Sequence, residues 1–378
     1  MRNDMKKIVY ADNAATTKLD LDAFEAMKPY FLEEYGNASQ PYSFSRTARR
    51  AIKEARKIIA SCINAKPEEI FFTSGGTESD NWAIKGSAFS DVYMRTIITS
   101  AIEHHAVLNA CKSLARLRYP VEYLSPKNDG VITPEILSDI ITDETRLVSV
   151  MLANNEIGTI QPIRALAELA HSHGALFHTD AVQCLGHIPI DVKELGVDML
   201  SASAHKFNGP KGVGFLYIKE GTHIVPYSDG GAQEFGLRAG TENVAGIVGM
   251  SIALKKNCEQ IVTNTKHLEK LEKILITNLD VAGIDYIRNG STTHVPGNIS
   301  LSFRGGDGEA ILHRLDLMAI CVSTGSACDS VNTQISHVLQ AIGLDENYAR
   351  GTIRISFGKD NSVEDAHKIV QALLKILK

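Results

Sequence analysis

Cys328 stands in a run of small and polar residues, CVSTGSACDS (321–330). A structural cysteine usually has apolar neighbours, because a free thiol behaves as a small, well-buried hydrophobe. Here Ser, Thr, Gly, Ser and Ala precede the cysteine, and Asp and Ser follow it. Such a run cannot form a core, so packing does not explain why a thiol lies on this polar segment.

Lys206 is the second residue that could do chemistry. It follows Ser203 and His205 in SASAHKFNGPKG (201–212), directly after an apolar run that we expect to be a strand. A lysine can carry out Schiff-base chemistry if burial lowers its pKa. Most lysines are solvated surface groups, and the polar neighbours of this one could instead hold a phosphate. The combination favours a functional site over a surface lysine.

Asp180 ends another apolar run, in HTDAVQ (178–183). Open α/β sheets present ligand groups at the carboxyl ends of their parallel strands. An aspartate aimed at a heterocyclic nitrogen would keep that nitrogen protonated, because an opposite charge favours the charged form. The alternative is that Asp180 caps the segment that follows it.

A glycine-rich turn precedes a predicted helix in TSGGTESDNWAIKG (73–86). Backbone N–H groups around Gly76, together with the Thr77 hydroxyl, could cradle a phosphate. Alternatively, the turn is a tight connection in which Thr77 is the helix N-cap. The segment has neither the lysine of a P-loop nor a GxGxxG pattern, which disfavours a nucleotide.

Two further polar pairs follow predicted strands. His104 and His105 could stack on a flat cofactor or transfer protons near neutral pH, although most such pairs only begin a surface helix. Asn154 and Asn155 indicate a loop first and a ligand site second.

All of these residues need a scaffold that brings strand ends together. Short apolar, β-branched runs alternate with helix-length segments, which predicts βαβ units and a mostly parallel sheet in an α/β fold. The predicted strands lie in EIFFTS (69–74), TIITS (96–100), LVSVMLA (147–153), ALFHTDAV (175–182), VDMLSASAHK (197–206) and GVGFLYIK (212–219).

The pattern changes after about residue 258. GNISLSF (297–303) and TIRISFG (352–358) alternate like strands, and Ser362 with Asp365 resembles a capping box before the last helix. A further helix is predicted from apolar residues at helical spacing, Leu268, Leu271, Leu275 and Leu279. These features predict a smaller α+β region at the carboxyl end of the chain.

The chain has 378 residues, 44% of them hydrophobic and 22% charged, which is ordinary globular composition. This length suits two domains. We expect a large domain over 13–258 and a small one over 259–378, with residues 1–12 packing as part of the small domain.

The net charge of −5 gives no basic excess for binding nucleic acid. The chain start lacks the apolar region of a secretory signal, and the longest apolar run, 244–254, is too short for a bilayer. Six cysteines without an export signal indicate a reducing compartment rather than disulfides, and no CxxC or HxxxH pair predicts a metal site. We expect a cytoplasmic protein with no nucleic-acid or membrane partner.

Taken together and in this order, these segments resemble pyridoxal-phosphate enzymes of the class V aminotransferase group, and specifically cysteine desulfurases of the NifS/IscS type. The resemblance implies the aspartate-aminotransferase-like fold (fold type I) and covers nearly the whole chain. The matching segments are DNAATT (12–17), TSGGTESDN (73–81), EHHAVL (103–108), NNEIGTIQP (154–162), HTDAVQ (178–183), SAHKFNGPKGVG (203–214), GLRAGTEN (236–243), STGSAC (323–328), SHVLQAIGL (336–344) and TIRISFG (352–358).

The resemblance assigns roles to residues of this sequence. Lys206 would bind pyridoxal 5'-phosphate covalently, and Asp180 would contact its pyridine nitrogen. Gln183 would bond to the ring hydroxyl, while His104 would stack on the ring face. The phosphate would be held by Gly76, Thr77, Ser203 and His205.

Further roles concern the substrate and a second subunit. Asn155, which also belongs to the implied cofactor contacts, and Arg354 would fix the substrate carboxylate, the arginine through its bidentate fork. Thr241 would reach the phosphate in the partner subunit, which implies a homodimer.

The family also explains the thiol, because the cysteine of STGSAC is its nucleophile. Cys328 would take the sulfur of L-cysteine, leaving alanine and a persulfide, with Lys206 as base and His104 as proton carrier. Attack on sulfur needs access, and the persulfide must then pass to an acceptor protein such as an iron–sulfur scaffold or a thiolation enzyme. A loop of small residues suits both steps.

Three positions depart from the family pattern: Tyr42, Phe235 and Gly351 stand where His, Arg and Ser are usual. None of them removes an assigned catalytic group, but they leave open how an acceptor protein is recognised. The role of Cys321 is also open, and we favour packing over sulfur relay for it. Three other functions remain open from the sequence, namely a selenocysteine lyase, a pyridoxal-phosphate transaminase, and a non-catalytic sulfur-transfer adaptor.

Overall fold

The structure is a computed structural model that describes residues 7–324 and 335–378. A seven-stranded sheet forms its centre, in the order β2–β8–β7–β6–β5–β3–β4. Strands β3 to β7 run parallel to one another, whereas β8 is antiparallel to both of its neighbours, so the predicted mostly parallel sheet is confirmed. The strands are β2 Ile70–Thr73, β3 Thr96–Ser100, β4 Val121–Leu124, β5 Thr145–Ser149, β6 Leu176–Asp180, β7 Met199–Ser203 and β8 Gly214–Ile218.

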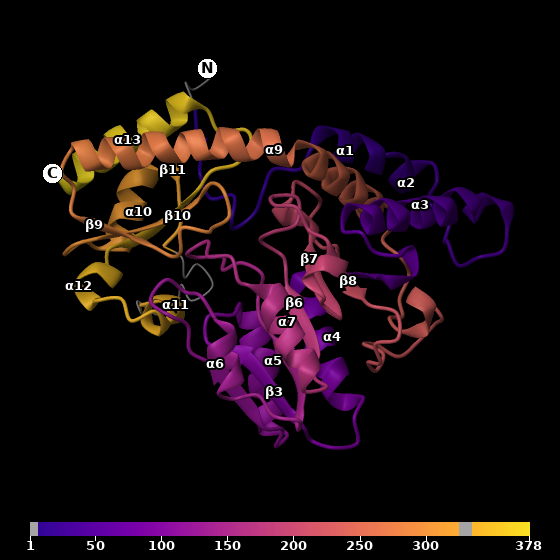
Figure 1. The fold of residues 1–378 in the computed structure, drawn as a ribbon. Coiled ribbons are helices and arrows are strands. Elements are labelled where there is room, and N and C mark those ends of the chain that lie inside the picture. The colour runs from indigo at the N-terminus through magenta and orange to yellow at the C-terminus, as the bar shows by residue number, and fades with distance from the viewer. Residues whose placement is uncertain (1–6, 325–334) are drawn as a thin grey trace.

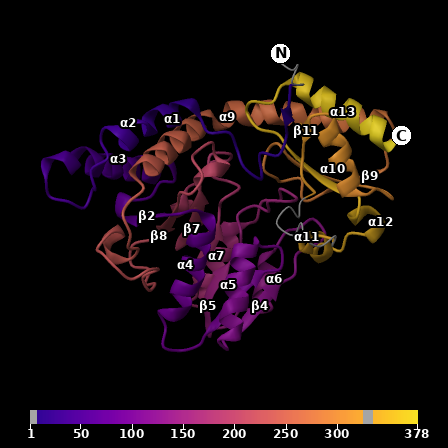
Figure 2. The ribbon, with the colours of Figure 1, turned by 180° about the vertical axis from the view of Figure 1, so that it is seen from behind.

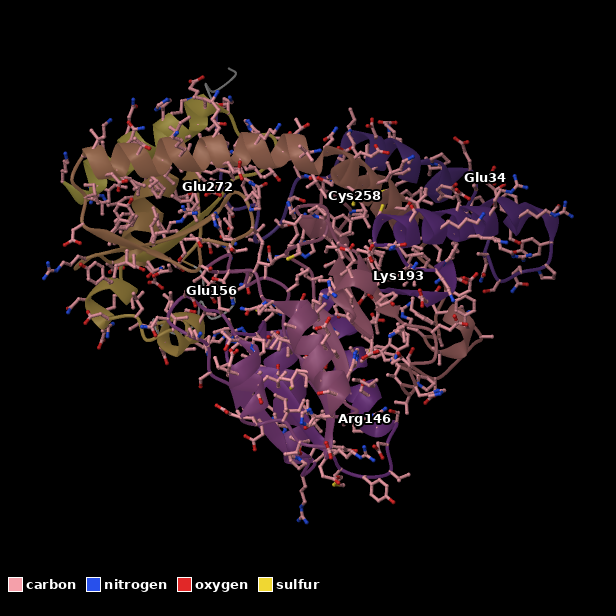
Figure 3. The ribbon with its side chains drawn as sticks, in the orientation of Figure 1. Glu34, Arg146, Glu156, Lys193, Cys258 and Glu272 are labelled. Atoms are coloured by element: carbon pink, nitrogen blue, oxygen red, sulfur yellow. The ribbon has the colours of Figure 1, made fainter. Side chains whose placement is uncertain are left out.

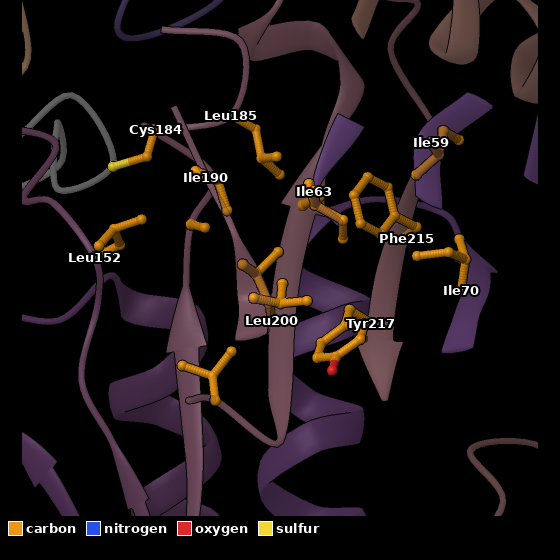
Figure 4. Close-up of a cluster of buried hydrophobic side chains, with 14 of the residues drawn as sticks. Ile59, Ile63, Ile70, Leu152, Cys184, Leu185, Ile190, Leu200, Phe215 and Tyr217 are labelled. Carbon is orange, nitrogen blue, oxygen red and sulfur yellow. The ribbon is translucent and has the colours of Figure 1, made fainter. Parts of the chain in front are cut away.

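Helices cover both faces of this sheet (Figures 1 and 2). Successive strand residues point to opposite faces, so Leu147 joins the core beneath α4 and α5, while Val148 joins the larger core beneath α3, α7 and the start of α9. Figure 4 shows part of the larger core around Leu200, Phe215 and Tyr217. Burial on both faces explains why these strands read as continuous apolar runs. The helices are α1 Leu21–Met27, α2 Pro29–Leu32, α3 Arg46–Cys62, α4 Gly76–Phe89, α5 His105–Arg116, α6 Pro134–Ser138, α7 Ile163–Ser172, α8 Val192–Leu195 and α9 Val244–Val281.

The carboxyl-terminal part has its own sheets and core. Strands β12–β10–β9 form an antiparallel sheet, and β1 pairs in parallel with β11. These strands pack with α10, α13 and the second half of α9 around a separate apolar cluster. Every residue of β10 and β12 is buried, so the alternation in their sequences does not mark an exposed face. The elements are β1 Val9–Tyr10, β9 Tyr286–Asn289, β10 Asn298–Phe303, β11 Ile320–Cys321, β12 Thr352–Ser356, α10 Gly308–Leu317, α11 His337–Ala341, α12 Glu346–Ala349 and α13 Val363–Leu377.

Helix α9 joins the two parts. The sequence predicted a helix only after residue 258, but one helix of 38 residues runs from Val244 to Val281 (Figure 1). Its first half packs in the large core and its second half in the small one, so the domain division at residue 258 stays a prediction. The capping box of Ser362 and Asp365 is confirmed at the start of α13. In residues 7–324 and 335–378, no helix is long and apolar enough to cross a membrane.

Candidate active site

A cavity of about 290 Å³ lies where the carboxyl ends of β6 and β7 meet the starts of α4 and α5. Such strand ends are where open α/β sheets hold ligands. Glu156, one of its lining residues, is labelled in Figure 3 between the large sheet and the smaller domain. The cavity brings together these predicted residues: Gly76, Thr77, His104, Asn155, Asp180, Gln183, Ser203, His205, Lys206 and Arg354.

Lys206 lies in a short 3₁₀ helix, Ala204–Lys206, that follows β7 directly. Its Nζ donates hydrogen bonds to the backbone oxygens of Ala14, at 2.5 Å, and Ala15, at 2.9 Å. The ammonium is therefore fixed by carbonyl groups of the amino-terminal segment, which the sequence had not linked to it. This arrangement holds the amine at the cavity wall next to the strand ends.

Asp180 is the last residue of β6 and is 5% exposed. Its Oδ1 accepts a hydrogen bond from the backbone N–H of Val182 at 2.9 Å, but the segment that follows is a turn rather than a helix, so the alternative that Asp180 is a helix cap is wrong. Burial raises the pKa of Asp180 to about 6, against the opposing effects of this hydrogen bond and of Lys206. The carboxyl is thus mostly charged at pH 7 and would favour a cation in the cavity.

A buried polar network lies beside Asp180. Both ring nitrogens of His178 contact serine hydroxyls, Nδ1 that of Ser149 at 2.8 Å and Nε2 that of Ser201 at 2.9 Å. Burial lowers the pKa of His178 to about 3, so this histidine is neutral at pH 7. Burial, followed by the charge of Asp180, raises the pKa of Asp80 well above its ordinary value. Asp180 therefore carries its charge among largely neutral neighbours.

The start of α4 lines the cavity at Gly76 and Thr77, where the sequence predicts a phosphate cradle. The N-cap is Gly75, at φ +148°, and no side chain of the described residues caps this end of the helix. The alternative that Thr77 is the N-cap is therefore wrong, because α4 already begins at Gly76. A Cβ at Gly76 would lie 2.8 Å from Cγ2 of Val182, so a side chain there would crowd the cavity. The helix end is free to receive an anion.

His104 is the N-cap of α5, and its Nδ1 accepts a hydrogen bond from the backbone N–H of Ala106 at 3.1 Å. Burial lowers the pKa of His104 to about 4, with further contributions from Lys206, His105 and His337. The ring is neutral at pH 7, and its proton lies on Nε2 because Nδ1 is an acceptor. His104 thus begins a helix, as one interpretation predicts, and it also lines the cavity.

Arg354 comes from the small domain, in the middle of β12, and is 3% exposed. Its Nη1 donates to the backbone oxygen of Asn155 at 2.9 Å, and its Nη2 donates to Oδ1 of Asp12 at 2.8 Å. Its Nε is buried and has no hydrogen-bond partner among the described residues. The guanidinium therefore keeps unused donors at the cavity.

The amino-terminal segment supplies contacts that sequence reasoning missed. Gln183 donates to the backbone oxygen of Ala14 at 3.0 Å, and Nδ1 of His205 lies 3.1 Å from Oγ1 of Thr16. Burial, then Lys206 and Lys211, lower the pKa of His205 to about 4. DNAATT had been matched to the family, but it carried no role. Other lining residues without an assigned role are Asp80, His105, Met151, Glu156, Val182 and His337.

Thr241 is not among the residues that line the cavity. Thr241 is exposed on the described chain, and its predicted contact concerns a second subunit. Cys328 lies outside the described residues. The described residues on either side of that gap are close to the site, since Ser323 exchanges backbone hydrogen bonds with Arg354, and His337 lines the cavity.

The residues present fit pyridoxal 5'-phosphate. An uncapped helix end with hydroxyl and imidazole groups suits the phosphate, and a charged carboxyl at a strand end suits the pyridine nitrogen. A lysine amine held at the same cavity suits a covalent link to the aldehyde.

Comparisons with known proteins agree with this fit. The family model described as aminotransferase class-V matches residues 9–369. A cysteine desulfurase IscS of Dictyoglomus turgidum is 48% identical over 375 residues, which is 99% of this chain and 95% of that protein.

Solved structures agree as well. A structure titled NifS-like protein superposes with a TM-score of 0.92 at 39% identity, covering 98% of this chain and 99% of that one. Another, titled SspA in complex with cysteine, has a TM-score of 0.83 at 37% identity and covers 92% and 98%. The chain therefore belongs to the class-V aminotransferase family and, within it, to the pyridoxal-phosphate-dependent cysteine desulfurases of the NifS/IscS type.

Proposed function

We propose that this chain removes sulfur from L-cysteine, releases L-alanine and carries the sulfur as a persulfide on Cys328. The observation that carries the proposal is the convergence of Lys206, Asp180 and Arg354 on one cavity beside an uncapped helix end. An amine, a carboxylate and a guanidinium in one cavity match the aldehyde and ring nitrogen of the cofactor and the carboxylate of an amino acid.

The cofactor supplies an electron sink for the bond changes at the substrate Cα and Cβ. Lys206 takes the proton from Cα, and in the cofactor-free chain two backbone oxygens hold its Nζ at the cavity. Asp180 keeps a charged carboxyl beside the ring position. His104 presents its N–H on Nε2 because its Nδ1 is engaged by the helix, so the neutral ring can donate a hydrogen bond in the cavity.

Arg354 and Asn155 orient the substrate. The guanidinium takes the carboxylate through donors that the described part of the chain leaves unused, and the Asn155 backbone oxygen fixes one side of the guanidinium. Because Arg354 is buried, the charge-assisted hydrogen bond forms away from bulk water, where it is stronger.

Cys328 then accepts the sulfur. Its thiolate attacks the substrate sulfur, a sulfur–sulfur bond forms, the substrate carbon–sulfur bond breaks, and the carbon keeps the electron pair until it is protonated on the way to alanine. The segment that carries Cys328 follows Thr324 and precedes Ile335, and its flanking residues Ser323 and His337 contact the site. This proximity supports the assignment.

The same proposal includes the cellular context. Thr241 of one subunit would reach the phosphate of the other in a homodimer, and a cytoplasmic acceptor protein, such as an iron–sulfur scaffold or a thiolation enzyme, would take the persulfide sulfur. The two separate apolar clusters support domains at 13–258 and 259–378.

Two variants test the proposal. Cys328→Ser should keep the absorbance of bound cofactor and lose sulfide release in the presence of a reductant, whereas Lys206→Ala should lose the spectrum of the covalently bound cofactor. Cys321→Ser is the matched control, since it removes the neighbouring thiol, and it should desulfurate like the wild type. Undiminished sulfide release by Cys328→Ser would refute the assigned nucleophile.

A further inference from the structure

Arg354 is held at two points, and both lie on its terminal nitrogens. Nη1 binds the backbone oxygen of Asn155 and Nη2 binds Asp12, while Nε has no partner among the described residues despite its burial. A guanidinium has five N–H donors in a rigid plane. Two fixed contacts define that plane, and the unpartnered Nε leaves donors for a planar anion.

Asp12 is itself firmly placed. Its backbone bridges to Ser356, the last residue of β12, which is the strand that carries Arg354. The next two residues continue this attachment, since Asn13 N–H donates to the Ser356 oxygen at 3.1 Å and Ala14 N–H donates to the Ser356 hydroxyl at 2.9 Å. The side chain of Asp12 therefore approaches Arg354 from a backbone that is fixed to the same strand.

The Asp12–Arg354 pair differs from an ordinary surface ion pair. The side chains of Asp12 and Arg354 are 19% and 4% exposed, and Arg354 lines the cavity. A buried cation needs a partner, but one carboxylate on Nη2 does not use all of its donors. The remaining donors set where a second carboxylate can bind and in which plane.

We propose that Asp12 is a positioning residue that orients Arg354 for the carboxylate of the substrate. The inference rests on the proposed function, because it specifies how the amino-acid substrate is held there. Without Asp12, the Asn155 oxygen is the one hydrogen-bond partner that the described residues give the guanidinium, so the guanidinium can turn about that contact. The substrate carboxylate then loses its aligned pair of donors, while the rest of the cavity is unchanged.

The test uses the cofactor-loaded protein and two small ligands that differ in the carboxylate. Binding is followed by the absorbance of the bound cofactor as L-alanine, which has the carboxylate, or ethylamine, which lacks it, is added. Asp12→Ala removes the contact with Nη2, and Asp12→Asn keeps an oxygen acceptor there. Asp22→Asn is the control, since Asp22 is an exposed acid paired with Lys256 in the same part of the chain.

Asp12→Ala should lower the affinity for L-alanine by about tenfold or more and change the affinity for ethylamine by no more than about twofold. Misplacing one positioning group lowers binding or rate by about this order. Asp12→Asn should recover most of the L-alanine binding, and Asp22→Asn should match the wild type for both ligands. With L-cysteine, the same Asp12→Ala protein should show a raised KM and a smaller change in kcat.

Equal weakening of both ligands by Asp12→Ala would show a structural role and overturn the inference. Unchanged or tighter L-alanine binding by Asp12→Ala would overturn it too. In that case the Asp12 carboxylate would only compete with the substrate carboxylate for Arg354. If Asp12→Ala does not fold, Asp12→Ser, whose shorter side chain also removes the contact with Nη2, takes its place and is judged by the same L-alanine and ethylamine outcomes. A wild-type protein that neither binds L-alanine nor desulfurates L-cysteine would instead refute the proposed function.

Discussion

The cavity has two ends that are built in different ways. The proposed cofactor end, Gly76, Asp180 and Lys206, comes from strand–helix units of the seven-stranded sheet, in the proposed large domain. The proposed substrate end, Asn155 and Arg354, joins a loop of that domain to strand β12 of the proposed small domain. The geometry of the cofactor end follows from the order of strands in one sheet. The geometry of the substrate end depends on how the two separate cores pack against each other.

This difference determines which contacts can be predicted from a short sequence motif. At the cofactor end each functional residue follows its own strand, and parallel strands place their ends side by side. At the substrate end the ion pair of Asp12 and Arg354 joins residues 342 positions apart. We therefore expect the two ends to respond separately to substitution, and the following experiments test that separation.

Arg354→Lys should have the largest effect. Lysine cannot make the bidentate contact and leaves Asp12 with a poorer partner. We expect the KM for L-cysteine to rise by about 10²-fold, with the affinity for the cofactor unchanged. Arg288→Lys, which alters a half-buried ion pair with Glu272 in the small domain, is the control. An equal loss of cofactor affinity in Arg354→Lys would mean that the two ends are not independent.

Gly76→Ala should affect only the cofactor end. The added Cβ would meet Cγ2 of Val182 at 2.8 Å, and overpacking of this kind costs about 1–3 kcal/mol. We expect cofactor affinity to fall by about tenfold, with an unchanged KM at saturating cofactor. Equilibrium titration of the cofactor measures this change. Adding Val182→Ala should recover part of the loss, and a double-mutant cycle with strictly additive effects would contradict the proposed clash.

Glu103 allows a smaller test, through the stability of the cofactor-free protein. Burial raises the pKa of Glu103 to about 8, although the Ser100 hydroxyl and the Met151 N–H donate to its Oε1. The unfolded chain releases this proton near its ordinary pKa, so stability falls as pH rises toward 8. The lowered pKa values of the buried histidines act in the opposite sense, but only below about pH 6.5.

The free energy of unfolding should therefore fall by about 1–2 kcal/mol from pH 6.5 to 8. Denaturant titrations at several pH values measure it. Glu103→Gln should flatten this slope. The raised pKa of Asp80 contributes in the same direction, so Asp80→Asn should flatten it as well. A slope that is the same in wild type and Glu103→Gln would show that Glu103 does not titrate in this range.

Much of the fold and of the cofactor end could be predicted from sequence because the signals are local. Buried strands read as apolar runs, and Asp180 and Lys206 directly end or follow two of them. The continuity of α9 could not be predicted, because its two halves face different cores and the apolar pattern shifts between them. The sequence made Thr77 a candidate N-cap, but the helix begins at Gly76. Its N-cap is Gly75, which has a positive φ that a glycine can adopt without strain.

The contacts of the amino-terminal segment could not be predicted from the sequence either. Ala14 and Ala15 act through backbone oxygens on Lys206, so their side chains carry no chemical signal. Asp12 contacts Arg354 because the start of the chain packs against strand β12, and no local sequence pattern indicates this packing. Sequence motifs can mark such a segment, but only its packing shows what it holds.

The central claim is that sulfur moves from L-cysteine to Cys328 in this cavity. The most direct measurement is a single turnover of the cofactor-loaded protein without reductant, followed by mass analysis of its cysteine peptides and quantification of alanine. We predict one added sulfur atom on the peptide that carries Cys328 for each alanine formed. Alanine formed without sulfur on that peptide, or sulfur located on Cys321 instead, would contradict the account.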